Sequence, residues 1–71
     1  MPKQPVLSGR QVVRALVSLG FEVERQRGSY VIMRRSSRVC VVPQHRELKR
    51  NTLGGVVEQA GVSLDELIAA L

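Results

Sequence analysis

The chain has 71 residues, which is enough for one small domain and no more. A formal net charge of +5 and an isoelectric point near 10.7 favour a polyanionic partner. The single cysteine, Cys40, excludes an intramolecular disulfide, and its apolar neighbours predict a buried thiol. The polar start and the short apolar runs predict neither a signal peptide nor a membrane span, so we expect a reducing, cytoplasmic location.

The charges are unevenly distributed along the chain. Residues 1–50 hold all eleven Lys and Arg residues and only three acidic ones, a net charge of +8, whereas residues 51–71 hold three acidic residues and no basic one. A basic body with an acidic end predicts two surfaces with different partners, and the basic one suits nucleic acid. The alternative is a solvated basic surface without a partner.

The first predicted element is a helix. Ser8 is a suitable N-cap for a helix that extends to about residue 18, and Gly20 is placed to end it in a left-handed conformation. Apolar side chains recur with helical spacing at Val12, Leu16 and Leu19.

Three predicted strands follow. Residues 21–26 alternate between apolar and polar side chains, which predicts a half-buried edge strand. Residues 29–34 are apolar on both faces, so we expect them to form a central strand. A third strand over residues 38–42 is stopped by Pro43, and the short connections imply an antiparallel meander.

Two helices are predicted to complete the chain. Asn51 or Thr52 is expected to cap the first, in which the Gly54-Gly55 pair predicts close packing or the close approach of a partner. The Ser-Leu-Asp-Glu sequence at 63–66 is typical of a capping box and predicts a last short helix. The order α-β-β-β-α indicates an α+β fold of two layers, a three-stranded antiparallel sheet backed by two helices, as in double-stranded-RNA-binding domains. We expect residues 1–71 to form one domain.

Few side chains are suited to catalysis. The chain holds one histidine (His45), one cysteine and one tyrosine (Tyr30), and its sequence shows no metal-binding cluster, phosphate-binding glycine loop or close pair of carboxylates. We therefore expect no metal and no cofactor. Cleavage of RNA is compatible with this inventory, because the 2′-hydroxyl of the substrate supplies the nucleophile. The protein then needs only a proton acceptor or donor and cations around the phosphate.

Several stretches resemble the HicA family of toxins. Gly28-Ser29-Tyr30 resembles the family's Gly-Ser-His element, and Val42-Pro43-Gln44-His45 with residues 47–53 resembles its V-P-x-H…E-L-K-K-G-T-L stretch. The helix that begins at Ser8 and the segment 59–63 are similar to the family's opening and closing helices. The resemblance implies a ribosome-independent endoribonuclease that cleaves mRNA on a double-stranded-RNA-binding-like fold. It also implies neutralisation by a HicB antitoxin that covers the active site.

The sequence departs from the family pattern at two positions. Tyr30 stands where the family has its catalytic histidine, and Asn51 replaces the usual glycine before Thr52. A free tyrosine side chain has a pKa of about 10, whereas that of histidine is about 6.5, so histidine is the better general base near pH 7. Losing a matched general base lowers a rate by about 10²- to 10⁴-fold. Three roles are open for Tyr30: a weak acid or base, a platform on which RNA bases stack, or an ordinary strand aromatic.

The remaining candidates are a second acid–base group and a set of RNA contacts. His45 is a candidate substitute for the missing acid or base if its loop folds back towards Tyr30, and is otherwise an exposed loop residue. Residues that flank the strand turns or precede the second predicted helix are suited to phosphate. These predicted RNA-binding residues are Arg25, Arg27, Ser29, Arg34, Arg35, Lys49 and Arg50. Arg10 and Arg14 are equally well explained as solvated surface.

Three functions are compatible with these residues. The leading one is an endoribonuclease toxin of a type II toxin–antitoxin system, attenuated by Tyr30 and held by a HicB-like antitoxin. The alternatives are a module of the same fold that binds RNA without cleaving it, and a protein-interaction domain whose basic face meets an acidic partner. The small size also leaves room for homo-oligomerisation.

Overall fold

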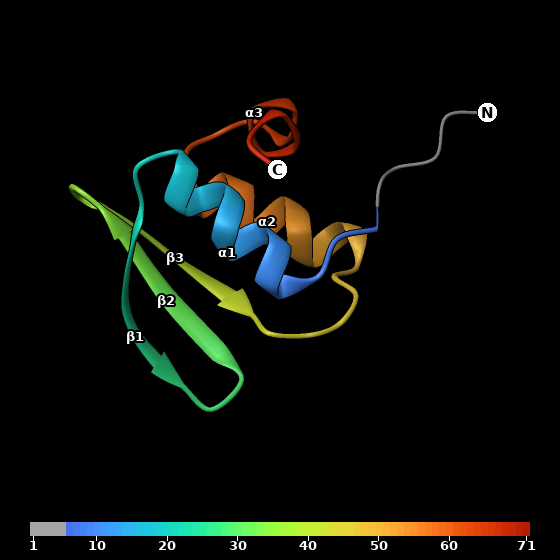
Figure 1. Cartoon of the computed structure of the whole chain (residues 1–71), viewed down its shortest axis with the longest axis horizontal. Coiled ribbons are helices and arrows are strands. Elements are labelled where there is room, and N and C mark those ends of the chain that lie inside the picture. Colours follow the sequence, from blue (N-terminus) through green and yellow to red (C-terminus); the bar gives the residue numbers. More distant parts are fainter. Residues whose placement is uncertain (1–5) are drawn as a thin grey trace.

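The computed structural model describes residues 6–71, in which three helices accompany one three-stranded sheet. The elements in chain order are α1 (Gly9–Ser18), β1 (Glu22–Arg27), β2 (Tyr30–Arg35), β3 (Arg38–Pro43), α2 (Arg50–Ala60) and α3 (Leu64–Ala69). The sheet is antiparallel with the order β1-β2-β3, and α1 and α2 pack on one of its faces (Figure 1). The predicted two-layer α+β fold is therefore confirmed. None of the helices in this part of the chain is long and apolar enough to cross a membrane.

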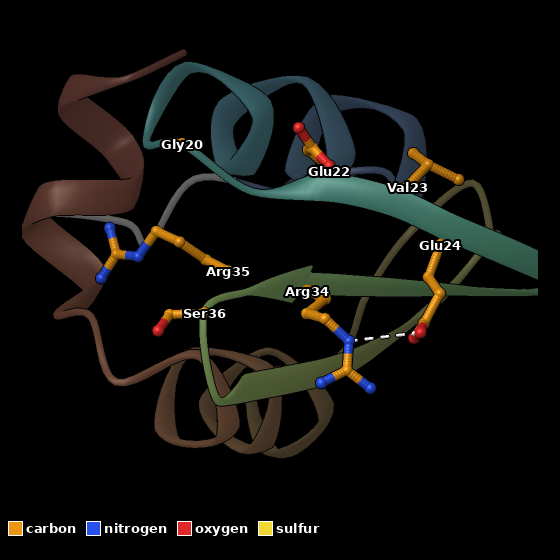
Figure 2. A pocket seen from close by; sticks show the side chains of 7 residues that line it. All are labelled: Gly20, Glu22, Val23, Glu24, Arg34, Arg35 and Ser36. Carbon is orange, nitrogen blue, oxygen red and sulfur yellow. Dashed lines mark hydrogen bonds and ion pairs between the residues drawn. The ribbon is translucent and has the colours of Figure 1, made fainter.

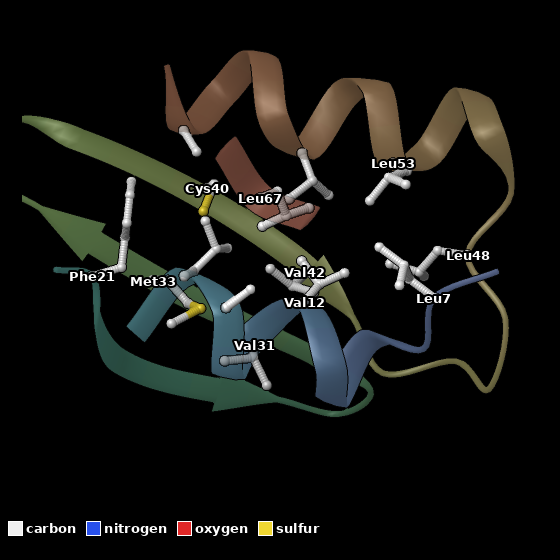
Figure 3. Close-up of a cluster of buried hydrophobic side chains, with 14 residues drawn as sticks. Leu7, Val12, Phe21, Val31, Met33, Cys40, Val42, Leu48, Leu53 and Leu67 are labelled. Atoms are coloured by element: carbon white, nitrogen blue, oxygen red, sulfur yellow. The ribbon is translucent and has the colours of Figure 1, made fainter. Parts of the chain in front are cut away.

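The core lies between the helices and one face of the sheet (Figure 3). Val31 and Met33 of β2 pair with Val42 and Cys40 of β3, and all four side chains are buried because alternate strand residues point to the same face. Burying one such side chain contributes about 1.5–3 kcal/mol, so this layer holds the helices on the sheet. The other buried hydrophobic residues of the core are Leu7, Val12, Ala15, Leu16, Phe21, Leu48, Leu53, Val56, Ala60 and Leu67.

The ends of α1 follow the prediction. Ser8 is the N-cap, and its hydroxyl accepts a hydrogen bond from the Gln11 N–H at 3.2 Å while the Gln11 side chain accepts one from the Ser8 N–H at 3.0 Å. This reciprocal pair is a capping box, which satisfies two backbone donors at once. Gly20 has a φ of +97° just after the helix, as its position predicted. The same device starts α3 at residues 63–66, where the sequence also predicted it.

The first turn of α2 differs from the prediction. The helix begins at Arg50 with Lys49 as its N-cap, no side chain caps it, and the predicted caps Asn51 and Thr52 lie inside the first turn. Leu48 accounts for this start, because its side chain is buried and its N–H donates to a backbone carbonyl before α1 at 2.8 Å. The chain thus enters the helix directly after a fixed residue. Asn51 is helical and has no positive φ, so nothing in its backbone requires a glycine.

β1 is the edge strand, as predicted, but it is not half-buried. All six of its residues are exposed, and Val23 is 52% exposed. Val23 lies opposite the buried Met33 and so has the expected orientation, but it belongs to the outermost strand, where the helical cover ends. The pairing also shifts between Val23 and Arg25, which makes Glu24 a bulge. A bulge with charged neighbours is a common way to protect a sheet edge from pairing with another chain.

The glycine pair of α2 does not pack closely within the chain. A Cβ atom built on Gly54 or on Gly55 would meet no other atom within 4 Å, and both residues are exposed. The predicted close packing is therefore wrong for the described chain, and the close approach of a partner stays a prediction.

Candidate functional site

The directions of the strands and helices divide the molecule into two ends (Figure 1). The loop end holds the β1–β2 turn, the loop at residues 44–49 and the first turns of α1 and α2. The α3 end holds the β2–β3 turn, the last turns of α1 and α2, and α3. Among the predicted site residues, the loop end holds Arg25, Arg27, Ser29, Tyr30, His45, Lys49 and Arg50.

Tyr30 begins β2 on the face of the sheet that the helices leave open. Its side chain is 48% exposed, and in the strand ladder it lies opposite Arg27 of β1 and Pro43 of β3. Gly28 in the preceding turn has a φ of +58°, a conformation that glycine adopts at little cost. Because directly opposed residues point to the same face, a guanidinium neighbours the exposed phenol ring. The ring is therefore accessible to a ligand.

The next position along this open face carries a second cation and apolar surface. Arg25 lies opposite Ile32, which in turn lies opposite Val41 of β3. Val41 is exposed and Ile32 is partly exposed, so β2 is central but only one of its faces is covered. The open face thus combines an aromatic ring, aliphatic side chains and two arginines. Flat apolar bases on a charged backbone are complementary to such a surface.

The loop after β3 is tied to the turn before β2 and to α1. The Gln44 N–H donates to the Ser29 carbonyl oxygen at 2.6 Å, and the Gly9 N–H donates to the His45 carbonyl oxygen at 2.9 Å. A Cβ atom on Gly9 would overlap the carbonyl oxygen of Pro43, so this approach of the loop to α1 requires a glycine. Ser29 therefore acts here through its backbone, and these bonds fix the position of His45.

His45 lines a surface pocket beside the start of α1. The pocket has a volume of about 380 Å³ and is lined by Ser8, Arg10, Gln44, His45 and Arg46. Tyr30 is not among the residues that line it. The loop does fold back towards β2 through its backbone, but the histidine side chain belongs to a group of residues separate from Tyr30.

Lys49 and Arg50 lie at the start of α2, and both are exposed. The first turn of this helix has no acidic residue and no side-chain cap, so its free N–H groups add to the positive potential. One carboxylate, Glu47, accompanies the basic side chains of the loop end. These basic residues are Arg10, Arg25, Arg27, Arg46, Lys49 and Arg50.

Arg34 and Arg35 lie at the α3 end and are engaged within the chain (Figure 2). The Arg34 Nε lies 3.2 Å from a carboxylate oxygen of Glu24, the one ion pair within residues 6–71. Arg35 points away from that pair: its Nη1 donates to the Leu19 carbonyl oxygen at 2.8 Å, and its guanidinium carbon lies 4.9 Å from the centre of the Phe21 ring. The structure therefore does not bring these two predicted RNA contacts to Tyr30.

Sequence reasoning does not single out Arg10 and Arg46 as site residues, yet both line the His45 pocket. Arg10 looks like helix surface, but it is the second residue after the Ser8 cap and thus lies in the first turn of α1. A cation is unfavourable at a helix N-terminus unless an anion is near, and this was the signal in the sequence. Arg46 directly follows His45, so the loop that holds one holds the other.

Among the described residues, neither a metal site nor a cysteine nucleophile is available for catalysis. In the part of the chain that the structure covers, no three His, Cys, Asp or Glu side chains come together as metal ligands do. The Cys40 side chain is buried, and desolvation raises its pKa to about 11, so it is unsuited to act as a nucleophile. Tyr30 and His45 remain the candidate proton donors or acceptors.

The fold and the site define a small two-layer α+β protein with one strongly basic end and an exposed tyrosine on an open sheet face. The sequence profile of the family described as the HicA toxin of bacterial toxin-antitoxin matches residues 9–62, which include α1, α2 and all three strands. The chain belongs to the HicA toxin family. Membership makes it the toxin of a toxin–antitoxin pair and implies an antitoxin partner of some kind. A comparison with curated proteins found no match.

Proposed function

We propose that this protein is a metal-independent endoribonuclease of a type II toxin–antitoxin system, which cleaves mRNA and is neutralised by a HicB-like antitoxin. The observation that carries the proposal is the position of Tyr30. It is exposed on the open face, lies opposite Arg27, and occupies the end of the molecule where the basic side chains gather. The resemblance to the family assigns the catalytic histidine to this position.

The proposed reaction requires few groups from the protein. The 2′-hydroxyl of the RNA attacks the adjacent phosphorus, and the bond from phosphorus to the 5′-oxygen breaks. Tyr30 donates its phenolic proton to the leaving 5′-oxygen, the proton of the 2′-hydroxyl passes to water, and solvent then reprotonates the phenolate. Arg27 stabilises the charge that develops on the phosphate. A phenol is less well matched than an imidazole to proton transfer near neutral pH, so we expect slow cleavage.

Two substitutions at one position test the catalytic part. The assay incubates purified protein, free of antitoxin, with labelled single-stranded RNA in the presence of EDTA. Tyr30→His should raise the cleavage rate by about 10²- to 10⁴-fold, because it restores a matched acid or base. Tyr30→Phe keeps the ring but removes the hydroxyl, and should abolish the residual cleavage. If Tyr30→His binds RNA and still leaves it intact, Tyr30 is not at the catalytic position.

His45→Ala separates the second candidate from the first. If His45 supplies the acid or base in place of Tyr30, His45→Ala abolishes cleavage and Tyr30→Phe leaves the rate unchanged. We expect instead that Tyr30→Phe abolishes cleavage and that His45→Ala leaves cleavage detectable, because His45 lines the pocket at α1 with Arg10 and Arg46, and Tyr30 does not line it.

The antitoxin part rests on the family and on the open face of the sheet. Along β3 this face exposes the aliphatic side chains of Val39 and Val41, each 37% exposed, that a protein partner can cover. A purified HicB-like protein should form a complex with the full chain on size-exclusion chromatography and stop RNA cleavage. Cleavage that continues in the isolated complex contradicts this part.

A second candidate function is RNA binding without cleavage, and the tyrosine at the family's histidine position favours it. Lys49→Glu or Arg50→Glu should then weaken RNA binding strongly, and the affinity should fall as the salt concentration rises. The absence of cleavage products from both the natural chain and Tyr30→His, with salt-sensitive binding retained, supports this candidate over the first.

A further inference from the structure

The pocket lined by Arg10, His45 and Arg46 has no part in the chemistry proposed at Tyr30. Its other lining residues, Ser8 and Gln44, are polar and uncharged, so no carboxylate lines it. Arg10 and Arg46 form no ion pair within residues 6–71. The lining of the pocket therefore includes two arginines and one histidine, and no acidic residue.

This arrangement is held in place by the backbone. The hydrogen bond from the Gly9 N–H to the His45 carbonyl oxygen, at 2.9 Å, fixes the loop against the first turn of α1. Because Gly9 has no side chain, the loop lies close enough for both arginines to line one pocket. The backbone that carries Arg10 and Arg46 is thus fixed by defined contacts.

The placement of Arg10 is unfavourable without a ligand. The first turn of α1 has no acidic residue, and Arg10 lies at the positive end of that helix and beside a second arginine. In α3 the first turn instead holds Asp65 and Glu66, which suit a helix N-terminus. An anion in the pocket relieves the repulsion and makes charge-assisted hydrogen bonds with both guanidinium groups.

We propose that this pocket binds a phosphate group of the RNA backbone, separate from the phosphate that is cleaved at Tyr30. The proposal rests on the proposed function, because it takes RNA as the ligand. Arg10 and Arg46 each present a planar fork of N–H donors that matches phosphate oxygens, and His45 adds a ring N–H. His45 is then a binding residue that positions the strand and not an acid or base.

The test measures affinity for an RNA that cannot be cleaved. A fluorescent single-stranded 2′-O-methyl oligonucleotide of mixed sequence lacks the free 2′-hydroxyl, so binding is separated from catalysis. Fluorescence anisotropy with the full chain compares Arg10→Gln and Arg46→Gln with the control Arg14→Gln. Arg14 lies one turn along the same helix, is exposed, and does not line the pocket.

Counterion release sets the loss in RNA affinity that is expected when one phosphate contact is removed. Counterion release gives a salt slope of about 0.7 per phosphate on a single strand, so each pocket variant should lose about 8-fold in affinity at 0.05 M salt and about 3-fold at 0.2 M. Arg10→Lys keeps the charge but lacks the planar fork, so it should recover part of the loss. Arg14→Gln should change the affinity and the slope little. The melting temperatures of these variants should match the natural chain, because the substituted side chains are exposed.

The outcomes separate this proposal from the function on which it rests. Equal effects of Arg10→Gln, Arg46→Gln and Arg14→Gln overturn the pocket proposal and leave RNA binding intact. Larger effects of the two pocket variants support it, even if Tyr30→His never cleaves RNA and the catalytic proposal fails. A natural chain that does not bind the oligonucleotide at low salt overturns both.

Discussion

The two ends of the molecule use arginine differently. At the loop end, Arg10, Arg25, Arg27 and Arg46 are exposed and form no ion pair within the described residues. At the α3 end, the arginines contact their own chain: Arg34 pairs with Glu24, Arg35 bonds to the last turn of α1, and Arg38 lies against Gly61. Arginine content alone therefore does not identify a ligand surface. A cation without an internal partner is available to a polyanion, whereas a partnered one contributes to the fold.

The two ends also differ in what holds them together. The loop end depends on backbone contacts, chiefly the bonds that Gly9 and Gln44 make with the loop and with β2. The α3 end depends on side chains, such as Arg35 and the buried Leu67. A backbone contact tolerates no added atoms, so the loop end should be the more sensitive to a small substitution.

Gly9→Ala should have the largest effect on stability. The added methyl group overlaps the Pro43 carbonyl oxygen, and backbone atoms cannot move aside as a flexible side chain does. We expect the free energy of unfolding to fall by about 3 kcal/mol. For a chain of this size that lowers the melting temperature by roughly 12–24 °C. Circular dichroism during heating measures the shift.

Gly54→Ala is the matched control for that substitution. It adds the same methyl group to an exposed helical glycine, where nothing lies within 4 Å. Its higher helix propensity should raise the free energy of unfolding by about 1 kcal/mol. Equal destabilisation by both substitutions contradicts the conclusion that the loop end depends on close backbone contact.

Both ends share a core that contains the buried thiol of Cys40. Burial raises the pKa of Cys40 from 9.0 to about 11, so its thiol stabilises the fold fully below pH 9. Above pH 9 the thiol ionises in the unfolded chain but stays protonated in the folded one, and the stability is lost as the pH rises towards 11. At pH 10.5 we expect a loss of about 2 kcal/mol relative to pH 8.

Urea unfolding at the two pH values measures this loss. Cys40→Ala removes the titrating group, so its free energy of unfolding should lack this part of the pH dependence. Parallel pH profiles for the two proteins contradict the assignment to Cys40. Probes of the two ends should report one transition, because both ends rest on the same core.

Periodicity and caps predicted most of the fold. The Ser8 cap, the glycine after α1, the order of the strands and the last capping box follow from local patterns, and the structure confirms them. The start of α2 does not follow from a local pattern, because it is set by the buried Leu48 and a hydrogen bond to a distant segment. The exposure of β1 depends on how far the helices extend over the sheet, which no alternation within the strand reveals.

The candidate site was predictable in composition but not in grouping. Arg27 and Arg35 both flank strand turns, so the sequence does not distinguish them. In the structure Arg27 lies opposite Tyr30, whereas Arg35 contacts Leu19. The register of the antiparallel strands decides which of them reaches the tyrosine. The grouping of Arg10 with residues 44–46 could not be predicted, because these residues lie 34 to 36 positions along the chain, in a loop that only the tertiary fold brings to α1.

Arg35→Ala should have the smallest effect and gives the most direct contrast between the two ends. The substitution removes the hydrogen bond to the Leu19 carbonyl oxygen and the contact with the Phe21 ring, which together contribute about 1 kcal/mol to stability at this exposed position. Arg27→Ala, at the loop end, should leave the free energy of unfolding nearly unchanged. Affinity for the 2′-O-methyl RNA should show the reverse order, with the greater loss for Arg27→Ala. If Arg35→Ala weakens RNA binding as much as Arg27→Ala does while the protein stays folded, the arginines of the α3 end serve the ligand as well, and an internal partner does not exclude a binding role.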